Sequence, residues 1–242
     1  MILGENQALS SAKPLADDLL ERYISHRLGK VISAYPELEL LLRELSRFGQ
    51  VILFGGFVRD AIHSYVHGVE TQMRDIDIVV DGALTDGADA LNNFGGHRRQ
   101  LAGSLKVDFW EMRRTYAFRH HLLEPLISNL PLSTVYTLNA CFFDIQTSRL
   151  VEHQAVRDIR RRSVAFNCRG YLEVFPEYQA FRALDLADRL GYALHADVLD
   201  FVASRLREST IGHFLAAVRR HRPEMTELEV KRLCEPFVMA AP

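Results

Sequence analysis

Long apolar runs are absent from this sequence. No segment approaches the roughly 20 apolar residues that a helix needs to cross a bilayer, and the first residues of the chain hold no apolar run of signal-peptide length. Cysteine is scarce, and its three widely spaced copies form no Cys-x-x-Cys pair, so the sequence indicates neither a disulfide framework nor a zinc site. We therefore expect a soluble, cytoplasmic protein that has no membrane partner.

An excess of one charge sign is also missing. The 29 Lys and Arg residues nearly balance the 31 Asp and Glu residues, which gives a formal net charge of −2. This balance predicts no general attraction for nucleic acid, although a near-neutral total can conceal a basic face. Short clusters of Arg and His, such as residues 97–99, are interpreted as solvated surface. The content of 48% hydrophobic and 25% charged residues is that of a globular protein with a sizeable core.

The spacing of hydrophobic residues predicts where helices and strands lie along the chain. Residues 14–47 repeat apolar positions at helical spacing with a break near Pro36, which predicts two helices. Short apolar or alternating runs predict strands over residues 51–54, 75–80 and 105–110. Further helices are predicted over residues 57–66, 83–92, 178–190 and 198–206. The C-terminal part of the chain is therefore expected to be wholly helical.

The predicted strand over residues 75–80 has two carboxylates on one face. The apolar residues at positions 76, 78 and 80 share one side of the strand, so Asp75 and Asp77 share the other. Two carboxylates at this spacing can hold divalent cations, and Mg²⁺ favours sparse carboxylate sites that water and phosphate oxygens complete. Such pairs also occur on ordinary solvent-facing strands, so the interpretation depends on the neighbouring residues.

Two neighbouring features support a phosphate site. Gly55 and Gly56 follow one predicted strand and precede a predicted helix, a position where the backbone can approach an anion and amides point toward it. Asp108 lies on the polar face of a later predicted strand. It is either a third carboxylate that orients or deprotonates an acceptor hydroxyl, or a surface acid of an edge strand.

Two segments together resemble a known family. Residues 53–60 read Leu-Phe-Gly-Gly-Phe-Val-Arg-Asp, and residues 74–80 read Arg-Asp-Ile-Asp-Ile-Val-Val. They resemble the signature of the poly(A) polymerase head-domain family, which includes class II CCA-adding tRNA nucleotidyltransferases and bacterial poly(A) polymerases within the DNA polymerase β superfamily. The resemblance extends over residues 51–201.

The resemblance implies an α+β fold. Its core would be a mixed β-sheet nucleotidyltransferase head domain flanked by helices, followed by a short all-helical neck. We expect N-terminal helices packed on the head in residues 1–50, the catalytic head in residues 51–170, and a helical neck-like region in residues 171–242.

The resemblance also implies substrates and site residues. An NTP, either ATP or CTP, would be the substrate, and Mg²⁺ or Mn²⁺ the cofactor. The expected metal ligands are Asp75 and Asp77, and the expected third catalytic acid is Asp108. The expected nucleotide-binding residues are Gly55, Gly56, Arg59, Asp60, Asn139 and Arg182. The expected acceptor-binding residues are Arg157, Arg160, Arg161 and Arg162.

Two family motifs are incomplete in this sequence. Asn139 matches a motif that usually reads Arg-Arg-Asp-x-x-x-Asn-Ala, but residues 133–135 are Ser, Thr and Val. The base-reading motif Glu-Asp-x-x-Arg is replaced by Phe175, Pro176 and Gln179 at its charged positions. These residues cannot present an acid and a guanidinium to a base edge, which predicts the loss of a protein-templated choice of C then A. The chain is also short beyond the neck, so we do not expect genuine CCA synthesis.

The leading hypothesis is a metal-dependent nucleotidyltransferase that transfers NMP from an NTP to an acceptor hydroxyl. Kinship favours an RNA acceptor with a tRNA-like 3′ end. A catalytically inactive module that binds NTP or RNA is one alternative, since both altered motifs are functional ones. A nucleotidyltransferase toxin that modifies a protein or an RNA is another, supported only by the small size of the chain. The sequence does not indicate the oligomeric state.

Overall fold

A computed structural model describes residues 18–71, 73, 75–84, 90–91, 96–220 and 222–238. The first described elements are helices α1 (Asp18–Ala34) and α2 (Pro36–Leu45). They meet at Pro36, because proline is tolerated in the first turn of a helix but not in its interior. The two helices predicted over residues 14–47 are confirmed. Glu21 of α1 is buried and its carboxylate accepts the backbone N–H of Leu150 at 2.9 Å, so α1 packs on a distant strand.

Seven of the described strands form one mixed sheet in the order β3-β4-β5-β2-β1-β6-β7. The strands are β1 (Gln50–Phe54), β2 (Asp75–Asp81), β3 (Ala90–Leu91), β4 (His97–Gln100), β5 (Lys106–Glu111), β6 (Cys141–Asp144) and β7 (Arg149–Glu152). Strand β2 pairs antiparallel with β1 and parallel with β5. The predicted α+β class with a mixed sheet is confirmed.

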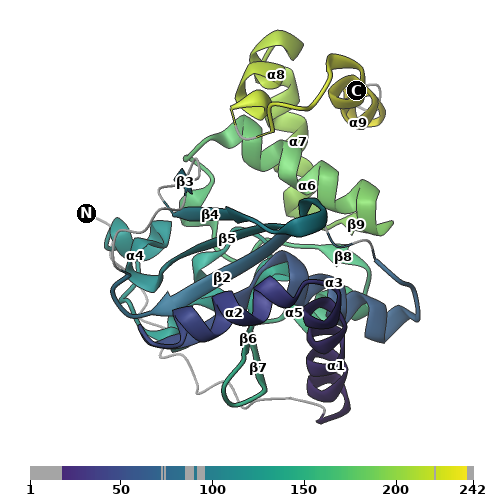
Figure 1. The fold of residues 1–242 in the computed structure, drawn as a ribbon. Helices are drawn as coiled ribbons and strands as arrows, with labels where there is room; N and C mark the ends of the chain where they lie inside the picture. The colour runs from purple at the N-terminus through teal and green to yellow at the C-terminus, as the bar shows by residue number, and fades with distance from the viewer. Residues whose placement is uncertain are drawn as a thin grey trace.

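Helices lie around the sheet (Figure 1). Helix α3 (Gly56–His67) follows β1 directly, and α6 (Pro176–Leu190) ends at Gly191, whose φ of 66° lets the chain turn as predicted. The other helices are α4 (Tyr116–Arg119), α5 (Ala155–Arg160), α7 (Ala196–Glu208), α8 (Ile211–Arg219) and α9 (Glu227–Val238). In Figure 1, α7, α8 and α9 lie beyond α6 at the top of the view, away from α1 and α2.

Each face of the sheet has its own core. Ile76, Ile78 and Val80 of β2 pack into the larger core, with residues of α1, α2, α3 and α6. Val79 points the other way, into a smaller core that includes Phe118 of α4. Because side chains alternate along a strand, Asp75 and Asp77 share the face of Val79. The acid pair therefore lies on the less covered face of the sheet.

Two predictions about secondary structure need correction. Within the helix predicted over residues 83–92, Ala90 and Leu91 form strand β3, and residues 85–89 lie outside the described residues. The pairing of β3 with β4 outweighs the local helical preference. The C-terminal part is not wholly helical either, because β9 (Ala193–Leu194) pairs in parallel with β8 (Ser163–Val164). A strand of two residues is too short to produce a recognisable hydrophobic repeat in the sequence.

No helix in the described ranges is long and apolar enough to span a membrane.

Candidate active site

The Gly55-Gly56 turn brings the backbone close to the acid pair. Gly55 has a φ of 65°, a conformation that favours glycine, and Gly56 begins helix α3 without a side-chain cap. The N–H groups of that first turn therefore have no acceptor within the helix. A Cβ atom at Gly55 would stand 3.6 Å from Oδ2 of Asp77, and one at Gly56 would stand 3.9 Å from Oδ1 of Asp75. The predicted phosphate turn and the predicted metal ligands thus lie side by side.

A third acid lies on the same face of the sheet. Asp77 of β2 and Asp108 of β5 are register partners in parallel strands, so both side chains project to the same side. Asp75 is exposed, Asp77 is half-buried and Asp108 is buried. Strand β5 is not an edge strand, because β4 lies beyond it. Strand pairing therefore gathers all three of the acids predicted to be catalytic.

The three carboxylates affect one another's ionisation. Burial raises the pKa of Asp77 to about 7, and the charges of Asp75 and Asp108 add to the increase. The positive charges of Arg182 in α6 and Arg59 in α3 act in the opposite direction. A cation beside Asp77 would also favour its ionised form. Two neighbouring carboxylates suit Mg²⁺, which completes its coordination with water and phosphate oxygens.

Asp108 is already paired with an arginine. Arg98 of β4 donates from Nε and Nη2 to the two carboxylate oxygens of Asp108, both at 2.7 Å. The two residues are register partners, so the pair is built into the β4–β5 hairpin. Within the described part of the chain, no group of three or more His, Cys, Asp and Glu side chains could hold a metal ion.

Behind the glycine turn, Arg59 and Asp60 form a buried ion pair. Nε of Arg59 donates to Oδ1 of Asp60 at 2.7 Å, and Nη1 of Arg59 donates to Oδ1 of Asn139 at 2.7 Å. The Nη2 atom of Arg59 would lie 3.7 Å from a Cβ atom at Gly56. Asp60 and Asn139 therefore hold the guanidinium with one nitrogen toward the turn. Three residues predicted to bind nucleotide thus form one connected group.

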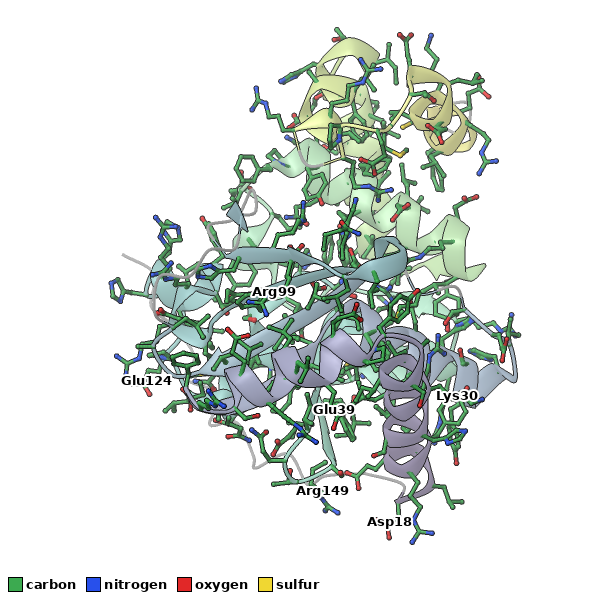
Figure 2. The ribbon with its side chains drawn as sticks, in the orientation of Figure 1. Asp18, Lys30, Glu39, Arg99, Glu124 and Arg149 are labelled. Atoms are coloured by element: carbon green, nitrogen blue, oxygen red, sulfur yellow. The ribbon has the colours of Figure 1, made fainter. Side chains whose placement is uncertain are left out.

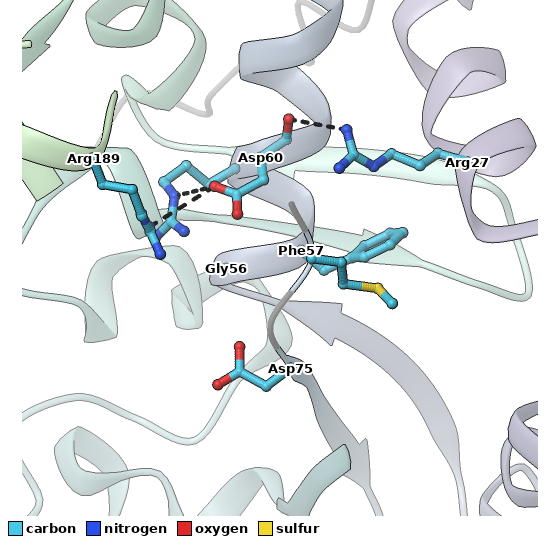
Figure 3. Close-up of a pocket in the computed structure, with 8 residues that line it drawn as sticks. Arg27, Gly56, Phe57, Asp60, Asp75 and Arg189 are labelled. Atoms are coloured by element: carbon cyan, nitrogen blue, oxygen red, sulfur yellow. Dashed lines mark hydrogen bonds and ion pairs between the residues drawn. The ribbon is translucent and has the colours of Figure 1, made fainter. Parts of the chain in front are cut away.

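Arg189 of α6 joins this group. Its Nη2 atom lies 4.0 Å from Oδ1 of Asp60 (Figure 3). Its Nε atom is buried and has no hydrogen-bond partner among the described residues. Burial, together with the positive charge of Arg59, lowers the pKa of Arg189 to about 10. Arg59 and Arg189 line a small hollow beside Gly56 and Asp75, so two positive charges lie next to the glycine turn and the acid pair.

Helix α1 lines the same hollow through Arg27 (Figure 3). Nη2 of Arg27 donates to the carbonyl oxygen and to Oγ1 of Thr71 at 2.9 and 2.8 Å, and its Nη1 donates to Oγ of Ser64 at 2.7 Å. Thr71 belongs to the loop that joins α3 to Asp75. Arg27 therefore ties the N-terminal helix to the segment that precedes the acid pair.

The structure places the predicted acceptor-binding arginines away from the acids. Nε2 of His67 donates to the carbonyl oxygen of Ile159 in α5 at 2.9 Å. His67 is at the opposite end of the 12-residue helix α3 from Gly56, about 16 Å away at 1.5 Å per residue. Arg157 is paired with Asp158 by two hydrogen bonds. The exposed residues of this segment also include Arg160, Arg161 and Arg162. They form an exposed basic segment beside the C-terminal end of α3.

The residues that replace the two family motifs have structural roles or lack charge. Oγ1 of Thr134 donates to backbone carbonyl oxygens, and Nδ2 of Asn167 donates to Thr134 Oγ1 at 3.2 Å. Oγ of Ser133 donates to the carbonyl oxygen of Leu130 at 2.6 Å. Phe175 caps the start of α6 with a φ of 59° and is 47% exposed. None of these residues offers an acid or a guanidinium to a base.

Sequence analysis missed Arg98, Arg189 and Arg27 as site residues. Arg98 was placed among the solvated charges. Its partner could have been found by pairing the strands of the hairpin, which set Arg98 opposite Asp108. No local signal marks Arg189 or Arg27, because their places depend on how α6 and α1 pack against α3.

The chain was also compared with known proteins. The sequence matches no protein-family model and no curated protein. Solved structures do match, and the complex structure of a CCA-adding enzyme with ATP gives a TM-score of 0.59 at 19% sequence identity, over 87% of this chain and 54% of that chain. The fold is that of the CCA-adding enzymes.

Two further structures agree with this assignment of the fold. The Thermotoga maritima CCA-adding enzyme complexed with tRNA gives a TM-score of 0.57 at 19% identity, over 84% of this chain and 51% of that one. A tRNA nucleotidyltransferase complexed with a primer tRNA and an incoming ATP analog gives 0.53 at 19% identity, over 78% and 58%. The chain therefore spans just over half the length of the structures it matches.

Proposed function

We propose that this protein is a metal-dependent nucleotidyltransferase that transfers NMP from an NTP to an acceptor hydroxyl at an RNA 3′ end. The observation that carries the proposal is the close approach of the Gly55-Gly56 turn to the carboxylates of Asp75 and Asp77. The turn supplies N–H donors for a triphosphate, and the acids supply ligands for a cation, within one site. Structures of the same fold include complexes with ATP, CTP and tRNA, which supports this choice of substrates.

Asp75 and Asp77 would hold Mg²⁺ or Mn²⁺, which would neutralise charge on the reacting phosphate when bound. The protein's own contribution is positioning and electrostatics. The first turn of α3 binds phosphate oxygens through its N–H groups, and Arg59 directs a fixed positive charge to the same place. The acceptor oxygen forms a bond to the α-phosphorus, the bond to the β-phosphate oxygen breaks, and pyrophosphate leaves. The acceptor hydroxyl proton passes to solvent.

A transfer assay tests this proposal. The protein is incubated with each of the four α-labelled NTPs, with Mg²⁺ or Mn²⁺, and with tRNA transcripts that lack their 3′ end or with total RNA. We expect label in RNA with the wild type and none with Asp77→Ala. Asp81→Asn is the matched control, because Asp81 is exposed at the other end of the same strand. No label in any RNA, with any NTP and either metal, would refute the proposal.

A second candidate is a module that binds NTP without turnover. The pairing of Asp108 with Arg98 favours it, because the guanidinium occupies the side of the carboxylate that would otherwise orient the acceptor hydroxyl. Calorimetry separates the two candidates. Mg²⁺-dependent NTP binding that disappears in Asp75→Ala and Asp77→Ala, combined with no transfer product, would support the binding module over the enzyme.

A further inference from the structure

The Arg98–Asp108 pair lies within the acid cluster rather than beside it. Asp108 is the register partner of Asp77 on one side and of Arg98 on the other. All three side chains project from the same face of neighbouring strands, which are about 4.8 Å apart. Figure 1 shows β4, β5 and β2 running side by side. A cation bound between Asp77 and Asp108 would therefore lie next to the guanidinium of Arg98.

The geometry of the pair leaves little room for such a cation. Each oxygen of Asp108 accepts one hydrogen bond from Arg98 at 2.7 Å, the bidentate arrangement that suits a planar guanidinium. The Asp108 side chain is 13% exposed and that of Arg98 is 41% exposed. The arginine therefore covers the carboxylate from the solvent side. A divalent cation at Asp108 would have to displace it or tolerate its charge at close range.

The charges of the cluster lead to the same conclusion. Asp75, Asp77 and Asp108 provide three carboxylates, and Arg98 cancels the charge of one of them through the bidentate pair. The other two carboxylates, Asp75 and Asp77, together carry the negative charge that one divalent cation would neutralise. Among the described residues, no group of three or more His, Cys, Asp and Glu side chains is placed to hold a metal ion, so no further protein carboxylate replaces the one that Arg98 neutralises.

We infer that Arg98 takes the place of a second metal ion at Asp108, so that the site binds one divalent cation, at Asp75 and Asp77. This inference rests on the proposed function and specifies how its active site is built. Arg98 is a positioning residue in this scheme, because it acts through Asp108. The acceptor then meets a fixed guanidinium–carboxylate pair at the position of the second ion.

The number of bound Mn²⁺ ions tests the inference. Protein-bound Mn²⁺ is counted by electron paramagnetic resonance in the presence of saturating non-hydrolysable ATP or CTP, against a blank with nucleotide alone. Two ions about 4 Å apart also give a spin-coupled signal, which a single ion cannot give. We expect one Mn²⁺ and no coupling in the wild type. We expect two coupled ions in Arg98→Gln, and a return to one in Arg98→Gln combined with Asp108→Asn.

Arg99→Gln is the matched control. Arg99 is the next residue of the same strand, but its Nη1 donates to Glu44 of α2 at 2.9 Å, on the opposite face of the sheet. Figure 2 labels Arg99 on the side of the sheet where α2 lies. This variant should bind one Mn²⁺, like the wild type, and circular dichroism shows whether each variant folds.

The outcomes separate this inference from the proposed function. Two Mn²⁺ ions in the wild type overturn the inference and leave the nucleotidyltransferase proposal intact, and this result does not depend on any variant folding. One ion in a folded Arg98→Gln also overturns it. No bound Mn²⁺ in any of the proteins overturns the metal site of the proposed function, and the inference with it.

Discussion

Replacing Asp77 with asparagine should stabilise the protein at alkaline pH. In the folded chain, burial and the neighbouring carboxylates raise the pKa of Asp77 from 3.8 to about 7. The folded state thus binds this proton more tightly than the unfolded state, and stability is lost as the pH rises from about 4 through 7. At 1.36 kcal/mol per pKa unit, the difference between the two pKa values corresponds to a loss of about 4 kcal/mol of stability above pH 7. Because Asp77 is only half-buried, solvent screening lowers the expected gain to about 2–4 kcal/mol.

Urea unfolding in EDTA, followed by circular dichroism, measures this effect. The free energy of unfolding of Asp77→Asn should exceed that of the wild type by an amount that grows from pH 5 to pH 8. Mg²⁺ should stabilise only the wild type. Asp81→Asn should stay within about 0.5 kcal/mol of the wild type at both pH values. If Asp77→Asn is no more stable than the wild type at pH 8, the three carboxylates do not crowd one another as the structure indicates.

Three further predictions concern residues around the acids. Arg59→Ala should cost about 3 kcal/mol or more in the free energy of unfolding, because buried Asp60 loses its hydrogen-bonded partner and keeps only the 4.0 Å ion pair with Arg189. Urea unfolding measures this cost. Gly55→Ala should cost about 1–3 kcal/mol, because its φ of 65° strains any residue with a Cβ atom, and it should weaken NTP binding measured by calorimetry. Reversing the charges of Arg160 and Arg161 should weaken RNA binding and reduce its dependence on salt concentration, measured by titration at several ionic strengths.

Matched changes elsewhere act as controls for these predictions. Arg43→Ala breaks an exposed ion pair and should cost less than about 1 kcal/mol, so an equal loss in Arg59→Ala would contradict the role given to the buried pair. Gly29 lies inside α1 with open space around it, and Gly29→Ala should stabilise that helix by up to about 1 kcal/mol. If the salt dependence of RNA binding is unchanged after charge reversal, Arg160 and Arg161 are ordinary surface charges.

Local signals predicted the central part of the site. The strand, glycine turn and helix around Gly55 follow from a short apolar run, a flexible turn and a helical period, all within about 20 residues. The alternation along β2 placed Asp75 and Asp77 on one face, because the side-chain period of a strand is two. These features depend on neighbouring residues alone, and the structure has them where the sequence indicates.

Pairing between strands determines the features of the site that the sequence did not predict. The parallel register of β2 with β5 brings Asp108 beside Asp77, and the β4–β5 hairpin adds Arg98 to the same cluster. Residues 83–92 were predicted to be a helix that follows the Asp81-Gly82 turn, whereas Ala90 and Leu91 pair with β4. In each case the partner strand, rather than the residue's own neighbours, determines the outcome.

The position of α1 also affects one edge of the sheet. Strand β7 is at one end of the sheet, where unpaired backbone groups invite another chain to add a strand. The carboxylate of Glu21 occupies one of these groups, the N–H of Leu150, and the charged side chain of Arg149 lies beside Asp18 at the same edge (Figure 2). A version of the protein that lacks α1 would therefore both lose the Arg27 tie to the loop before Asp75 and expose a free sheet edge to aggregation.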